Sequence, residues 1–272
     1  FDYPLPQFAH LPMMMANKSE KLSKRHGAVS VTEYRDKGWA PEGLLSYLVR
    51  FGWSYGDEEL FTLRSLVEKF DWSRVNKADG IYDWRKCGAI NSKYVAQLAP
   101  DAEVTRGAAR FLRERGFDLR DDDSRLAAAL PHVRPRAEVK VPGARPGETP
   151  PLPPGPYAVI AEGLDWLFRD EPVMDASAAE KFFTADAAPR LRQIADVVDA
   201  ITDWSEATVR SALEAWLARE GLEIKTVAQP ARVALTGRST SPGLYEVIAL
   251  LGRERAVARL RRAADGASGT AA

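Results

Sequence analysis

Apolar side chains recur every three or four residues along most of this chain, and this spacing indicates α-helices. Pro41 suits the first turn of a helix that Gly52 ends, and the apolar face of that helix holds Leu44, Leu45, Leu48, Val49 and Phe51. Another helix is expected over 101–115, before Gly116. Alternation typical of strands is scarce, apart from one short strand expected within 11–16. The pattern therefore predicts a mainly α fold.

Polar residues at expected helix starts support this prediction. Ser30 with Glu33 has the spacing of a capping box, and Thr62 and Asp83 are suited to N-cap positions. The second half of the chain carries apolar stripes throughout. It is expected to be all-helical, with helices over 157–169, 176–183, 187–201, 205–220 and 241–264.

A proline-rich stretch separates these two helical regions. Between Pro142 and Pro156, seven of fifteen residues are proline and three are glycine. Proline lacks a backbone N–H and resists helix formation, so the stretch is expected to be a linker or a long exposed loop.

Composition narrows the possible classes of protein. The chain has 272 residues, 45% of them apolar, which is enough for more than one core. With 38 basic and 38 acidic residues, a nucleic-acid partner would need locally clustered cations. The single cysteine, Cys87, and three histidines cannot supply a four-ligand zinc site. No bilayer-spanning run or secretion signal is present, so a cytoplasmic protein without membrane contact is expected, with a monomer as the default.

One short segment has the chemistry of a polyphosphate site. In the sequence Lys21-Leu22-Ser23-Lys24-Arg25-His26-Gly27, three cations and an imidazole lie beside a glycine that permits close backbone approach. Ammonium groups here would stabilise charge building on ATP phosphates during attack by a carboxylate. A short basic run is also common on an ordinary solvated surface, and composition alone does not exclude that interpretation.

This segment resembles the Lys-Met-Ser-Lys-Ser motif of class I aminoacyl-tRNA synthetases, and the appended His26-Gly27 resembles the bacterial-type glutamyl branch. Further stretches agree in order from about residue 8 to about 263: 41–48, Phe51-Gly52-Trp53-Ser54, Phe70-Asp71, 91–95, 229–237 and 241–244. Departures from the family pattern are the proline-rich stretch and the small residues Cys87 and Ala89.

The resemblance implies a role for each motif residue. Lys24 would contact the ATP phosphates and stabilise the adenylation transition state, Lys21 and Ser23 would shape the loop, and Arg25 replaces the motif's last serine. His26 either stacks on adenine or stabilises phosphate, or it only hydrogen-bonds within the loop; both interpretations stay open. ATP with Mg²⁺ is the implied cofactor of the full-length enzyme, and no zinc is expected in this fragment.

The resemblance also implies a division of labour along the chain. Residues 1–100 would hold the lysine loop and a stem-contact helical domain, 101–165 a first anticodon-binding helical subdomain with the proline-rich loop, and 166–272 a second. Unstacked anticodon bases are bound by planar and cationic groups. In an equivalent helix of the family an arginine reads the third anticodon base; Arg136 is the best match, Arg134 is the alternative one turn away, and Lys140 lies nearby.

Two other groups of residues have competing interpretations. The final helix carries Arg253, Arg255, Arg259, Arg261 and Arg262, which either contact phosphates or are merely solvated. The tryptophans Trp166, Trp204 and Trp216 lie on apolar helix faces and are expected in the core.

The function implied is that of part of a glutamate–tRNA ligase, which activates glutamate with ATP and transfers it to tRNA(Glu). None of the histidines, His10, His26 and His132, begins the sequence His-Ile-Gly-His of the catalytic nucleotide fold, and the chain starts with Phe1. A fragment that is inactive alone is therefore expected. One alternative is a non-catalytic tRNA-binding module, against which the motif lysines argue. The other is a glutamyl-transfer paralogue built on the catalytic half alone, against which the helices after residue 100 argue.

Overall fold

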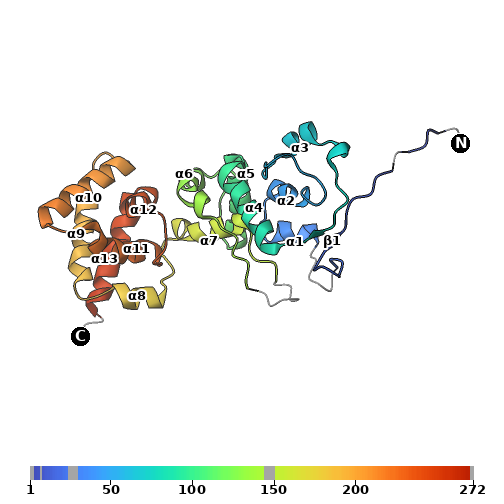
Figure 1. The fold of residues 1–272 in the computed structure, drawn as a ribbon. Coiled ribbons are helices and arrows are strands. Elements are labelled where there is room, and N and C mark those ends of the chain that lie inside the picture. Colours follow the sequence, from blue (N-terminus) through green and yellow to red (C-terminus); the bar gives the residue numbers. More distant parts are fainter. Residues whose placement is uncertain (1–2, 7, 24–29, 144–150, 270–272) are drawn as a thin grey trace. The chain divides into compact units, whose positions relative to one another are not determined.

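The computed structural model describes residues 3–6, 8–23, 30–143 and 151–269 and consists mainly of helices (Figure 1). In chain order its elements are β1 (Met14–Met15), α1 (Val31–Asp36), α2 (Pro41–Leu48), α3 (Leu63–Lys69), η2 (Trp72–Arg74), β2 (Gly80–Ile81), α4 (Trp84–Gln97), α5 (Asp101–Glu114), α6 (Ser124–Val133), η3 (Arg134–Arg136), α7 (Pro156–Phe168), α8 (Ala176–Phe182), α9 (Ala187–Asp199), α10 (Glu206–Glu220), α11 (Ile224–Thr236), α12 (Leu244–Leu251) and α13 (Arg253–Gly269). The predicted mainly α fold is confirmed. No helix in the described ranges is long and apolar enough to cross a membrane.

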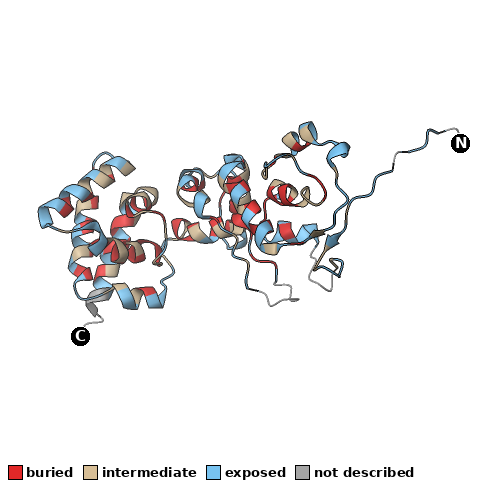
Figure 2. Cartoon of the chain, in the orientation of Figure 1, coloured by how far each residue is buried: buried red, intermediate tan, exposed pale blue. Residues whose placement is uncertain are grey.

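The chain separates into two compact units. Unit 1 comprises residues 1–115 and 134–161, and unit 2 comprises residues 116–133 and 162–272. In each unit the helices turn their buried residues toward neighbouring elements and leave the opposite side exposed (Figure 2). The division at residues 100 and 165 suggested by the sequence stays a prediction.

The helix starts in unit 1 follow the local sequence. Ser30 accepts a hydrogen bond from the backbone of Thr32 at the start of α1, and Thr62 forms a capping box with Ser65 at the start of α3. Asp83 caps α4 through two backbone N–H groups. These caps confirm three predicted helix starts, although Ser30 forms a single cap where a capping box was expected.

The main core of unit 1 lies between α2 and α4. It contains Tyr34, Trp39, Leu44, Tyr47, Tyr82, Cys87, Ile90 and Leu152. A smaller hydrophobic cluster consists of Leu66 from α3 together with Trp53 and Phe61. The predicted strand within 11–16 is the two-residue β1, which pairs in parallel with β2. This pairing was not foreseen, because β2 is too short to show an alternating pattern.

Part of the proline-rich stretch is packed where exposed loop was expected. Leu152 is 5% exposed within the core of unit 1, and the indole of Trp39 donates to the carbonyl of Pro153 at 3.0 Å. Gly155 lies so close to Gly38 that a Cβ would be 2.4 Å from the backbone there. A chain of prolines offers carbonyl acceptors and few donors, so it can be buried wherever donors come from its neighbours.

Unit 2 is a helical assembly in which α9 packs along α13 and α11 contacts α8, α9, α12 and α13. Trp166 and Trp216 are 1% and 2% exposed, which confirms the expected core positions for these two; Trp204 is only half-buried. The helix expected over 241–264 is instead two helices, because Gly252 adopts φ +81° between α12 and α13. The patterns did not predict α6 or α11, since each contains a proline, Pro131 or Pro230.

Candidate functional site

A turn immediately before Lys21 fixes the start of the basic segment. The side-chain carbonyl of Asn17 accepts hydrogen bonds from the backbone N–H groups of Ser19 and Glu20 at 2.9 and 3.0 Å. The backbone then reverses, so that Leu22 N–H donates to the Met14 carbonyl at 2.9 Å and Lys21 pairs with Met15. This turn therefore places the first motif lysine beside β1.

That turn is held on the core through β2. Backbone hydrogen bonds join Gly80 to Met13 and Tyr82 to Met15, and the carboxylate of Asp79 accepts from Met13 N–H at 2.9 Å. Because Tyr82 is buried in the core, the base of the basic segment is tied to the same cluster that packs α2 against α4. The segment thus begins at a defined position in unit 1.

The first three residues of the motif, Lys21, Leu22 and Ser23, lie within the described ranges. Lys21 is exposed and Ser23 is half-buried, while Leu22 between them packs on the core. Lys24, Arg25 and His26 lie outside the described residues. The geometry of the predicted phosphate site therefore rests on Lys21 and its anchoring.

The two arginines proposed for base reading have different surroundings. The guanidinium of Arg134 donates to the carbonyls of Val95 and Ala99 and pairs with Asp101, and its side chain is only 15% exposed. Since these carbonyls lie at the C-terminal end of α4, Arg134 caps that helix with a positive charge. All three partners are in unit 1, and this geometry favours a structural role for Arg134.

Arg136 and Lys140 are both exposed, on a segment that runs along α4. Ala137 is 3% exposed, and the backbone N–H of Val139 donates to the hydroxyl of Ser92 at 2.9 Å. The segment therefore alternates inward and outward side chains, although the expected helix is only the short η3. This alternation presents Arg136, Glu138 and Lys140 to solvent.

A cleft of about 480 Å³ lies beside this segment in unit 1. It is lined by Arg85, Ala89, Ser92, Lys93, Glu138, Val139 and Val141. Arg85, Ala89 and Lys93 are spaced by four residues, so they share one face of α4. Arg85 and Lys93 were not predicted from the sequence, although this spacing could have indicated a cationic helix face. The small side chain of Ala89 leaves room between the two cations.

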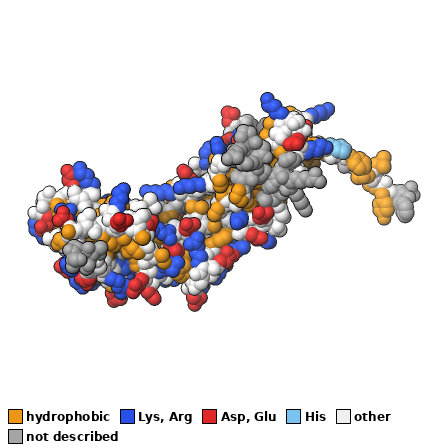
Figure 3. Space-filling model, turned by 90° about the horizontal axis from the view of Figure 1, so that it is seen from below, with side chains coloured by type: hydrophobic (Ala, Val, Ile, Leu, Met, Phe, Trp, Pro, Cys, Tyr) orange, Lys and Arg blue, Asp and Glu red, His pale blue; other side chains and the backbone are white. Residues whose placement is uncertain are grey.

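Charges elsewhere are mixed. On the face drawn in Figure 3, Lys and Arg side chains are interspersed with Asp and Glu, in keeping with their equal numbers in the sequence. Near the cleft, the carboxylate of Glu59 lies 3.9 Å from Lys86 and 3.7 Å from Lys93. The local cationic surface of unit 1 is therefore partly offset by acidic neighbours.

In the core of unit 1, two tyrosine hydroxyls and the thiol of Cys87 from α4 form a chain of hydrogen bonds. The hydroxyls of Tyr34 and Tyr82 share a hydrogen bond of 2.6 Å, and Tyr82 donates to Cys87 Sγ at 3.2 Å. Burial raises the pKa of all three groups, that of the Cys87 thiol to about 12. Cys87, noted above as unusually small for its position, is thus a neutral member of the core.

Most arginines of α13 bind groups inside unit 2. Arg259 is 2% exposed and donates to the carbonyls of Leu235, Trp166 and Arg169. Burial, and secondarily the charge of Arg255, lowers the pKa of Arg259 to about 10, so it stays charged at neutral pH. Arg261 pairs with Asp196 and Asp199. For Arg259, both interpretations drawn from the sequence, phosphate contact and solvation, are therefore wrong.

Comparisons with known proteins match both ends of this chain. Residues 1–86 match the family described as tRNA synthetases class I (E and Q), catalytic domain, and residues 158–264 match the anticodon binding domain. The chain is 36% identical over 261 residues to the glutamate–tRNA ligase of Geobacter sulfurreducens, covering 96% of this chain and 52% of the relative. The corresponding ligase of Anaeromyxobacter dehalogenans is 38% identical, covering 96% and 51%.

A solved structure shares the fold. A glutamate tRNA ligase from Elizabethkingia meningosepticum, crystallised in complex with its amino acid, superposes with a TM-score of 0.75 at 20% identity. The match covers 97% of this chain and 52% of that structure. The chain thus spans about half the length of the curated relatives it matches.

Proposed function

Because this chain belongs to the glutamate–tRNA ligase family over the half of the family's length that it spans, we propose that it supplies a ligase with an ATP-contacting lysine loop and a tRNA-binding helical region. The observation that carries the proposal is the order of the two matches. The class I match includes Lys21 and Lys24, and all but the first four residues of the anticodon-domain match lie in unit 2. We propose a cytoplasmic, monomeric full-length enzyme.

The lysine loop acts in the first half-reaction. An oxygen of the glutamate carboxylate bonds to the α-phosphorus of ATP, the bond from that phosphorus to the bridging oxygen breaks, and pyrophosphate leaves. Negative charge moves onto the α-phosphate and the leaving group, and Mg²⁺ accompanies these phosphates. Lys24 stabilises this charge, with Lys21, Ser23, Arg25 and His26 shaping and lining the loop. The backbone of Lys21 is held beside β1, and this supports the assignment, because a cation is oriented only when the backbone that carries it is fixed.

In the second half-reaction a terminal ribose hydroxyl of tRNA attacks the glutamyl carbonyl, and AMP leaves. Residues of this chain contribute by holding the tRNA. We assign contacts with RNA to Arg136 and Lys140, which are exposed on one segment, and to Arg85 and Lys93 of the adjoining cleft. Arg134 supports that segment by capping α4.

The proposal includes the predicted division of the chain into 1–100, 101–165 and 166–272, with tRNA contact in all three parts. Binding of this chain to tRNA(Glu) and to an unrelated tRNA, measured by fluorescence anisotropy over 50–300 mM salt, tests it. Binding that is tighter for tRNA(Glu) and weakens with salt supports the proposal, because neutralised phosphates release counterions. Equal affinity for both tRNAs at every salt concentration contradicts it.

A further inference from the structure

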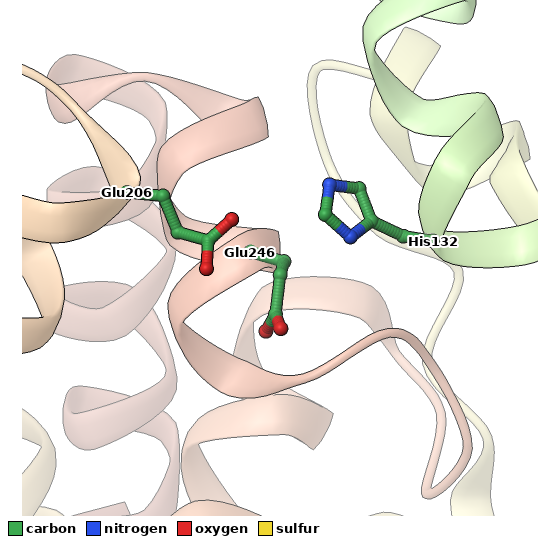
Figure 4. Close-up of side chains that lie close together, drawn as sticks. All are labelled: His132, Glu206 and Glu246. Atoms are coloured by element: carbon green, nitrogen blue, oxygen red, sulfur yellow. The ribbon is translucent and has the colours of Figure 1, made fainter.

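Three side chains able to bind metal converge within unit 2. His132 lies near the end of α6, Glu206 begins α10, and Glu246 lies in the first turn of α12 (Figure 4). One nitrogen and two carboxylate oxygens lie within 4.8 Å of one another. The close-up shows the three side chains extending from separate helices toward a common space.

The convergence is set by helix packing and caps. Leu126, Ala129 and Leu130 form the buried face of α6, which contacts α12. The capping box of Ser205 and Thr208 fixes the start of α10, and therefore the position of Glu206. Acidic residues in first turns and a histidine in a last turn each suit the dipole of their own helix. That preference acts within single helices and does not require the three to meet.

The local partners leave this cluster short of positive charge. Arg210 pairs with Glu206 at 2.9 Å, lies over the Tyr245 ring and also interacts electrostatically with Glu246, so one cation is shared by the two carboxylates. Among the described residues, neither the His132 imidazole nor the Glu246 carboxylate takes part in a hydrogen bond or ion pair. All three members of the cluster are half-buried, so water can reach them while much of each side chain is fixed.

We propose that His132, Glu206 and Glu246 bind a divalent transition-metal ion, with Zn²⁺ the best fit and water completing its coordination. Tetrahedral Zn²⁺ bonds of about 2.1 Å place two donor atoms about 3.4 Å apart, so the donor atoms need to approach one another by up to about 1.4 Å. Rotation about the side-chain bonds of the two glutamates can move their oxygens that far. One imidazole nitrogen with two carboxylates suits Zn²⁺ better than Mg²⁺, which prefers six oxygens and retains its water.

The bound ion would connect α6 to α10 and α12, which lie far from it in the sequence. Its role is therefore structural: it stabilises unit 2 and takes no part in the chemistry proposed for the lysine loop. This differs from the sequence-based expectation of no zinc, which considered only sites of four cysteine or histidine ligands. Three ligands with water, two of them glutamates, need neither Cys87 nor the other histidines.

Calorimetric titration of the EDTA-treated, dialysed chain with ZnCl₂ tests the proposal. We expect one equivalent to bind and the melting temperature to rise. His132→Ala and Glu246→Gln should each weaken binding about tenfold or more, as expected for lost ligands. His10→Ala, which removes an exposed histidine of unit 1, is the matched control and should bind as the unchanged chain does. Millimolar Mg²⁺ should not compete.

Co²⁺ titration gives a second readout, because its visible absorption reports bound nitrogen and oxygen ligands. The absorption should appear with the unchanged chain and be lost in Glu246→Gln, a variant that keeps the shape of the side chain. Circular dichroism establishes that each variant is folded. Substoichiometric binding, or binding that His132→Ala and Glu246→Gln leave unchanged, overturns the proposal. Neither measurement depends on tRNA or ATP.

Discussion

The side-chain amide of Asn91 is paired with both backbone polar groups of Ala40. Its Nδ2 donates to the Ala40 carbonyl at 2.8 Å, and Ala40 N–H donates to its Oδ1 at 3.0 Å. Asn91 is fully buried in α4, and Ala40 is the N-cap residue of α2. The pair therefore joins the two helices that frame the core of unit 1, on which Leu22 packs.

Replacing Asn91 should destabilise unit 1 strongly. Asn91→Ala leaves the buried N–H of Ala40 without a partner, which costs about 1–3 kcal/mol, while the Ala40 carbonyl keeps its hydrogen bond from Leu44 N–H. We expect the free energy of unfolding, measured with urea, to fall by about 2 kcal/mol. Asn76→Ala, which removes one hydrogen bond at an exposed turn, should cost less than about 1 kcal/mol. Similar losses for both variants would contradict this account.

The same contact explains a helical glycine. A Cβ on Gly43 would lie 2.7 Å from the Asn91 amide nitrogen and 3.1 Å from its Cα. Gly43→Ala should therefore reduce the free energy of unfolding by about 1–2 kcal/mol and lower the melting temperature, despite alanine's higher helix propensity. Gly163 in α7 has open space around it. Gly163→Ala should instead stabilise by about 0.5–1 kcal/mol, and the opposite ranking would refute the packing argument.

The two arginines of η3 should separate stability from tRNA binding. Arg134→Ala removes charge-assisted hydrogen bonds at the end of α4 and should reduce stability by about 2 kcal/mol. Arg136→Gln should leave stability within about 0.5 kcal/mol. It should weaken binding of tRNA(Glu) by about 1–3 kcal/mol. Chemical unfolding measures the stability of each variant, and fluorescence anisotropy measures its affinity for tRNA(Glu). Unchanged tRNA binding in Arg136→Gln would show that Arg136 does not contact the tRNA.

The lysine loop should act on the chemical step. In the full-length ligase, Lys24→Ala should slow adenylate formation by about 10²–10³, as loss of a preorganised charge does, while tRNA affinity stays nearly constant. Rapid-quench measurement of adenylate and anisotropy with tRNA separate the two effects. Lys18→Ala, a nearby exposed lysine outside the motif, is the control. Equal loss of both activities in Lys24→Ala would count against its assigned role.

Stability should fall at alkaline pH. Burial raises the pKa of Cys87 from 9.0 to about 12, and it also raises the pKa values of Tyr34 and Tyr82. Above pH 9 the unfolded chain therefore binds fewer protons than the folded one, so stability is lost as pH rises from 9 toward 12. Each group contributes a slope of up to about 1.4 kcal/mol per pH unit.

Urea unfolding at several pH values from 8 to 11 measures this slope. Cys87→Ala should make it shallower between pH 9 and 10, where the thiol of the unfolded chain loses its proton. The thiol should also resist Ellman's reagent at pH 8 until the protein unfolds. A Cys87 that reacts in the native state would show that it is more accessible than the structure indicates.

Helix positions were largely readable from the sequence, because their causes are local. Asp83, Thr62 and Pro41 act within one turn of the helices they start, and apolar stripes at helical spacing identify α2 and α5. Helix prediction from the pattern was wrong at two positions, one proline and one glycine. Pro230 lies inside α11, where a helix was not expected, and Gly252 divides a stretch that was predicted as one helix.

The sequence by itself determined the mainly α fold and the family, since caps, periodicity and ordered motifs depend on residues close together in the chain. Tertiary structure alone decided which charged side chains face inward. Arg134 and Arg136 are two positions apart, yet one caps α4 and the other faces solvent. His132, Glu206 and Glu246 meet only because three helices pack together. Contacts between distant segments depend on how buried faces fit, and no short-range pattern records that fit.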